Sequence, residues 1–193
     1  MNRKFNFLQI IGFLLVLLSF SVLIGSEWIS NRNSQHLQEL TLTIQSRLPE
    51  RIQGDPESYS DAAMPVLEID GMDFCGLLEL PAFGLSLPIG SSWDVNSLSR
   101  YPCRFWGSTY DSSLIIGGAN KQDHFGFITR LDIGDKISVT DMTGTEFSYE
   151  VTRIDRRSHA DMDSFLESSS DLTLFVKDKL SQNYIIVRCS FGI

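Results

Sequence analysis

The chain begins with an apolar run that is unlike the rest of the sequence. Residues 7–25 read FLQIIGFLLVLLSFSVLIG and contain no charged side chain. A helix needs about 20 predominantly apolar residues to cross the hydrocarbon core of a bilayer. Arg3 and Lys4 precede the run, whereas Ser26 and Glu27 follow it, and positively charged flanks stay in the cytoplasm. The pattern predicts a single-pass membrane anchor with a cytoplasmic amino terminus and an extracytoplasmic remainder.

A cleaved signal peptide is the alternative interpretation of this run. Such a peptide has an apolar core of about 7–15 residues, followed by small residues at the cleavage site. Here the apolar core is longer, and its exit at residues 22–25 (VLIG) is a weak cleavage site. We therefore expect residues 1–26 to form a cytoplasmic tip and an uncleaved anchor.

Behind this run, apolar residues recur at helical spacing on an otherwise polar segment. The stripe consists of Leu37, Leu40, Ile44 and Leu48. Spacings of three and four predict a helix with one apolar face, and Pro49 ends it. We expect a spacer helix, with pairing to another membrane protein as the alternative. Residues 49–65 are polar and contain prolines, so residues 27–65 are expected to be a stalk and linker.

From residue 66 onward the pattern changes to short runs that are apolar or alternate between apolar and polar. The expected strands are residues 74–80, 85–89, 114–117, 136–141, 146–153, 172–177 and 184–189. Alternation is clearest where Phe147, Tyr149 and Val151 share one face. Residues 141–144 (DMTG) predict a turn, and a short helix is expected near residues 160–168. Many short strands with few helices indicate a barrel or a sandwich over residues 66–193.

Charge and cysteine content exclude some classes of function. The formal net charge is −8, with 24 acidic and 16 basic residues, and nucleic-acid binding needs basic patches. Cys75, Cys103 and Cys189 are too scattered for a disulfide framework or a metal site. One disulfide between two of them remains open, although free buried thiols are the simpler expectation. We expect no cofactor and no metal, and the sequence leaves calcium dependence undetermined.

Several motifs go further than this periodicity. They are residues 76–89 (GLLELPAFGLSLPI), 101–108 (YPCRFWGS), 114–135 (LIIGGANKQDHFGFITRLDIGD), 171–175 (DLTLF) and 182–189 (QNYIIVRC). In order and in spacing these segments resemble the sortase family, in its class B-like branch. The resemblance implies a mostly β fold: a closed barrel of about eight strands with short helices.

The resemblance also implies a chemistry. Sortases are cysteine transpeptidases that cleave a sorting signal on a secreted protein and join its new carboxyl end to an amine of the cell wall or a pilin. A cysteine attacks the scissile carbonyl, a histidine handles the proton, and an arginine on the final strand steadies the oxyanion or substrate. The implied place is the cell membrane of a Gram-positive-type surface.

Two of these three functional positions are altered in this chain. The family's Gly-His-Asn corresponds to Gly118-Ala119-Asn120, so Ala119 stands at the histidine position. The family's Leu-Thr-Leu-x-Thr-Cys corresponds to residues 172–177, which places Lys177 at the cysteine position and Val176 at the threonine position. Alanine cannot exchange a proton, and an amine attacking a peptide carbonyl would give a dead-end amide. Arg188 is expected to be the one retained catalytic-type residue.

The resemblance therefore favours an inactive sortase that binds a sorting-signal peptide, another sortase or a surface protein. The alternative is an active cysteine transpeptidase that uses Cys189 or Cys103 with His124. Cys189 directly follows Arg188, and successive strand residues face opposite sides, so Cys189 is expected to point away from the site. His124 is expected to be a packing residue of its loop. A decaying gene copy without function is a third reading.

Overall fold

In the computed structural model, described residues are 11–16, 35–59, 63–121, 124–158, 170–178 and 181–192. Met1–His36 and Leu37–Ile193 form two compact units. Residues 11–16 of the first unit are helical and exposed, while most of the predicted anchor and the predicted helix near residues 160–168 lie outside the described residues. Across the described ranges, no helix is both long enough and apolar enough to cross a membrane.

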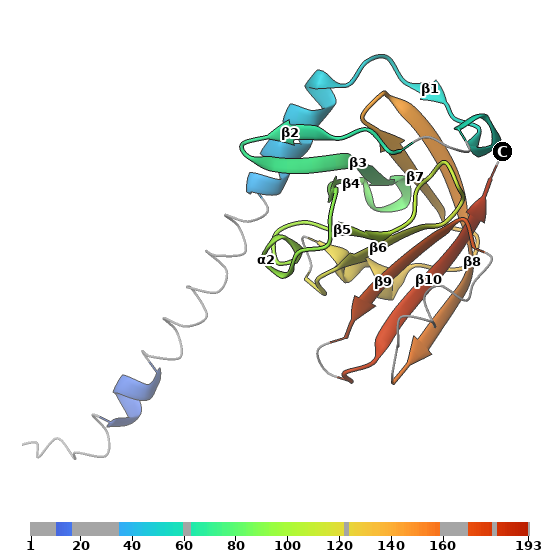
Figure 1. Ribbon diagram of the computed structural model, residues 1–193. Helices are drawn as coiled ribbons and strands as arrows, with labels where there is room; N and C mark the ends of the chain where they lie inside the picture. Colours follow the sequence, from blue (N-terminus) through green and yellow to red (C-terminus); the bar gives the residue numbers. More distant parts are fainter. Residues whose placement is uncertain are drawn as a thin grey trace, which may run out of the picture. The chain divides into compact units, whose positions relative to one another are not determined.

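The second unit is built from short strands, as the sequence pattern predicts (Figure 1). The strands are β1 (Ile52–Gln53), β2 (Leu67–Ile69), β3 (Met72–Leu80), β4 (Leu85–Gly90), β5 (Cys103–Trp106), β6 (Leu114–Gly118), β7 (Lys136–Asp141), β8 (Thr145–Arg157), β9 (Leu172–Lys177) and β10 (Tyr184–Phe191). The short helices are η1 (Pro56–Tyr59), η2 (Pro81–Phe83), α2 (Val95–Leu98) and η3 (Phe125–Arg130).

The sheet closes into a barrel because β7 pairs with both β3 and β8. The ring runs through β3, β4, β5, β6, β9, β10, β8 and β7 and then returns to β3. This closed ring confirms the predicted barrel of about eight strands. Two contacts in the ring are parallel, β4 with β5 and β6 with β9, and the others are antiparallel. Closure leaves no free edge inside the ring.

Alternation along each strand sends one set of side chains into the barrel. On β8, Phe147, Tyr149 and Val151 are buried together in the interior core, which confirms the predicted alternation. The hairpin before them turns at residues 141–144, again as predicted. Asp141 is fully buried there and accepts hydrogen bonds from the backbone N–H groups of Thr143 (2.7 Å) and Thr145 (3.0 Å). A buried carboxylate with these donors fixes the turn.

The segment predicted as a spacer helix is helical over residues 35–47. The apolar face of this helix packs against the chain itself rather than against another protein. Leu37, Leu40 and Ile44 are buried against Phe74 and Leu77 of β3 in a second hydrophobic cluster. The compact unit begins at Leu37, so the segment expected to be stalk and linker contributes directly to its packing.

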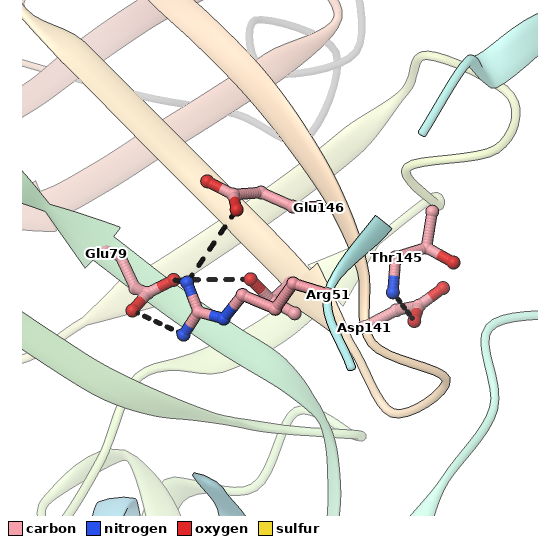
Figure 2. Close-up of polar contacts among 6 residues, drawn as sticks. Arg51, Glu79, Asp141, Thr145 and Glu146 are labelled. Atoms are coloured by element: carbon pink, nitrogen blue, oxygen red, sulfur yellow. Dashed lines mark hydrogen bonds and ion pairs between the residues drawn. The ribbon is translucent and has the colours of Figure 1, made fainter. Parts of the chain in front are cut away.

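A short strap continues from this helix across the barrel. β1 pairs in parallel with the start of β8, where Ile52 lies opposite Thr145. Arg51, just before β1, binds both carboxylate oxygens of Glu79 at 2.6 and 2.9 Å, and lies 3.7 Å from Glu146 (Figure 2). A two-pronged arginine–carboxylate contact is geometrically specific, so it fixes the strap on the barrel wall.

Candidate functional site

Two of the predicted site positions lie side by side at the ends of neighbouring parallel strands. The register of β6 and β9 pairs Gly118 with Val176 as its last pair. Ala119 directly follows the end of β6, and Lys177 is the last residue of β9. One residue further on, the side-chain amide of Asn120 donates to Asp178 at 3.5 Å, so the two chains stay adjacent beyond the sheet. The structure therefore brings the predicted histidine and cysteine positions together.

Arg188 is not brought to the same place. It pairs with Thr173, four positions along β9 from Lys177, which corresponds to about 13 Å along a strand. Its side chain is only 7% exposed, and its Nε lies 3.4 Å from the carboxylate of Asp155 on β8. Arg188 thus belongs to a partly buried charge pair on the sheet.

Tyr184 is the residue of β10 that lies opposite Lys177. The ammonium of Lys177 is 5.8 Å from the centre of the Tyr184 ring, which is a cation–π distance. Sequence reasoning missed Tyr184 because the offset between β9 and β10 depends on the loop at residues 178–183. That loop is closed by the backbone N–H of Asp178, which donates to the carbonyl of Asn183 at 2.7 Å.

The side chains near Lys177 lie on the outer surface of the barrel. Leu174 and Val176 of β9 point into the interior core, so Phe175 and Lys177 point outward. Phe175 packs with Ile115 and Ile186 in a cluster separate from that core, and Phe105 and Tyr184 border it. We call this set the outer-face cluster.

Trp93 covers the outer-face cluster. Its ring stacks on Phe175 at 5.6 Å and meets Phe105 edge-on at 4.9 Å, and these two phenylalanines are 5.4 Å apart. Gly117 of β6 makes this approach possible, because a Cβ there would lie 2.5 Å from both the Trp93 and the Phe175 rings. The loop is set by Asp94, which caps α2 by accepting from the Ser97 N–H at 2.8 Å.

The three cysteines are not exposed on this face, although Cys103 of β5 lies opposite Gly117 of β6. Cys75, Cys103 and Cys189 are free and fully buried, as the simpler expectation held. Cys189 belongs to the interior core, which confirms that it points away from the side where Arg188 lies. Burial raises the pKa of Cys75 and of Cys189 to about 12, and that of Cys103 to about 11. With their pKa values raised in this way, the three thiols stay protonated at neutral pH.

His124 is fully buried at the start of η3, with its ring 5.7 Å from that of Phe125. A Cβ on Gly118 would lie 2.9 Å from the His124 ring, so histidine and glycine pack closely. This agrees with its predicted packing role. His36 is exposed, and His159 lies outside the described residues. Among the described side chains, no three His, Cys, Asp or Glu residues gather as a metal site requires.

Comparisons with known proteins agree with the fold. A protein-family model described as the sortase domain matches residues 78–187. A search of curated proteins gives no match. Among solved structures, Clostridium perfringens sortase C with the C-terminal cell wall sorting motif has a TM-score of 0.55 at 21% identity, covering 63% of this chain and 71% of that one.

Two further solved structures show the same likeness. Sortase C1 of GBS pilus island 1 has a TM-score of 0.56 at 16% identity and covers 84% of this chain and 82% of its own. Listeria monocytogenes sortase A has a TM-score of 0.52 at 17% identity, with 62% and 88% covered. These neighbours are class A and class C sortases, and the class B-like resemblance stays a prediction. The matched domain spans more than half of the chain, which therefore belongs to the sortase family.

Proposed function

We propose that this chain is a catalytically inactive sortase that binds an extended peptide of the sorting-signal type. The observation that carries the proposal is the parallel register of β6 and β9, which sets Ala119 beside Lys177. With these residues at the histidine and cysteine positions, the site has neither a proton-transfer group nor a thiol nucleophile.

The placement of Tyr184 supports the same proposal. The family mechanism needs an arginine near the nucleophile, and Arg188 lies four positions further along the strand pair. We propose that Tyr184 occupies the arginine position, so that all three functional positions are altered. An aromatic ring supplies no cation for an oxyanion, although it keeps a surface on which a peptide side chain can pack.

The test uses the purified full-length protein with fluorogenic sorting-signal peptides and a wall-type amine. We expect peptide binding without turnover above a boiled sample. The positive control is Ala119→His with Lys177→Cys and Tyr184→Arg, which should regain thiol reactivity and some cleavage. Turnover by the unmodified chain would contradict the proposed inactivity, and absence of any peptide binding would contradict the proposed role.

An active cysteine transpeptidase with relocated residues is the competing function. It would need Cys189 or Cys103 to act with His124. The burial of both thiols and their raised pKa values speak against it, as does the burial of His124. Peptide turnover that disappears when the protein is alkylated under native conditions would favour this alternative.

We further propose that residues 7–25 anchor the protein in the cell membrane with the barrel outside. The support is the uncharged 19-residue apolar run behind Arg3 and Lys4. Protease added to intact cells with the wall removed should digest the barrel. Protection of the barrel until the membrane is permeabilised would contradict this orientation.

A further inference from the structure

Lys177 is exposed, and its ammonium lies over the ring of Tyr184. No ion pair joins Lys177 to a carboxylate of the described residues. The adjacent Asp178 is held by its own loop, where one carboxylate oxygen accepts from the Ser181 hydroxyl at 2.6 Å and the other from Asn120 at 3.5 Å. A positive charge is thus presented at the end of β9.

An apolar platform lies next to this charge. Side chains two residues apart on a strand share a face, so Phe175 lies on the same face as Lys177, about 7 Å away along β9. Trp93 stacks on Phe175 and leaves 39% of its own surface exposed. The same face therefore carries the exposed cation of Lys177 and, stacked on Phe175, a partly exposed indole.

In a working sortase the atom at the cysteine position meets the scissile carbonyl carbon. Here an ammonium stands at that position. An ammonium attracts a negatively charged group, and the scissile carbonyl carbon becomes part of such a group when it is converted into a carboxylate. Hydrolysis of a peptide bond makes such a group, because water adds to the carbonyl carbon and the amine leaves with a proton.

Resting on the proposed function, we infer that Lys177 binds the terminal carboxylate of a peptide, while the exposed face of Trp93 holds an apolar side chain just before it. The ligand class is the acid-ended fragment left when a peptide bond has been hydrolysed. The reaction that supplies the ligand is thus a peptide hydrolysis carried out elsewhere.

The experiment measures binding of full-length protein to acetylated pentapeptides with an apolar penultimate residue. Each peptide is made as the free acid and as the terminal carboxamide. The acid should bind about tenfold more tightly, as expected for one charge-assisted hydrogen bond, and the ratio should shrink at high salt.

Matched variants assign this preference to one residue. Lys177→Gln should bind acid and amide equally, whereas Lys177→Arg should keep the preference. Lys136→Gln is the control, because Lys136 is a highly exposed lysine on β7, away from β9, with only a 4.0 Å contact to Glu150. It should keep the full acid-to-amide ratio.

The outcomes separate this inference from the proposed function. Equal binding of acid and amide by the unmodified protein overturns the carboxylate site and leaves peptide binding intact. A carboxamide peptide with an internal glutamate that binds as tightly as the free acid also overturns it, because a side-chain carboxylate would then be the ligand. Binding of neither form contradicts the proposed function itself.

Discussion

At the residue scale, neighbouring side chains on β9 occupy opposite environments. Val176 is fully buried in the interior core, while Lys177 is exposed on the outer face. Restoring the family's threonine and cysteine would change both residues. The two substitutions should lower the free energy of unfolding by very different amounts. The chemistry of the outer face and the stability of the core can therefore be varied separately at these adjacent positions.

Val176→Thr should destabilise the protein by about 1–3 kcal/mol, because it buries a hydroxyl among apolar neighbours. Urea unfolding of the variant and the parent measures the difference. Lys177→Thr is the matched control and should stay within about 0.5 kcal/mol, since its side chain is exposed. A buried threonine that costs nothing would mean that its hydroxyl finds a hydrogen-bond acceptor in the core.

The buried thiols predict low reactivity and a dependence of stability on alkaline pH. At pH 8 Ellman's reagent should react slowly with the native protein and rapidly with all three cysteines in guanidinium chloride. Fast native labelling would show that a thiol is accessible.

The folded-state pKa of Cys189, about 12, lies above its ordinary value of 9.0. The neutral thiol of Cys189 therefore contributes its full share to the free energy of unfolding below about pH 9, and this share is lost as pH rises toward 12. Burial raises the pKa of Tyr110 and of Tyr149 in the same direction. Guanidinium unfolding at several pH values should show this fall, and Cys189→Ala should make it shallower.

The structure lays Ala119 and Lys177 at the ends of neighbouring strands, whereas Arg188 lies four positions along β9 from Lys177. Ala119 and Lys177 could be paired because their motifs end two parallel strands, whose register carries few alternatives. Arg188 and Tyr184 could not be told apart, because a hairpin register depends on the conformation of the loop before it. The position of Trp93 could not be predicted from the spacing of apolar residues, because Trp93 lies in a loop and packs against side chains of the sheet.

At the scale of elements, the helix at residues 35–47 shows that an apolar stripe does not by itself identify the surface against which it packs. Spacing alone predicts the buried face but says nothing about what buries it. Here the partner is the chain's own β3. Strands were predicted best where an apolar run is bounded by turns, as in β7 and β9. β1, β2 and β5 were missed because runs of two to four residues carry too little periodicity.

Ile44→Ala should cost about 2–5 kcal/mol, because Ile44 is fully buried between the helix and the barrel. Leu42→Ala is the matched control on the same helix, where the side chain is 65% exposed, and it should cost under about 0.5 kcal/mol. Thermal unfolding of the two variants measures the difference. Equal stability of both would mean that the helix is detached from the barrel in solution.

At the scale of the whole molecule, the barrel depends on segments that precede its predicted boundary at residue 66. Residues 37–59 bury Phe74 and Leu77 and hold the strap through Arg51. Removing them would expose a contiguous apolar surface.

A chain that starts at residue 66 should therefore unfold at a much lower temperature than one that starts at residue 35, or should aggregate. The measurement is thermal unfolding together with binding of a hydrophobic dye. The chain from residue 35 is the control and should match the full-length protein. Equal unfolding temperatures for the two shortened chains would show that the helix and strap are dispensable.

The position of β10 has a consequence for how the molecule is made. β10 lies between β8 and β9, so the last strand in the sequence occupies the interior of the sheet (Figure 1). A nascent chain emerging from its amino end has no complete barrel until residues 184–191 are available. Until then β8 and β9 present open edges that other chains can pair with. The barrel therefore cannot close until β10 has been synthesised.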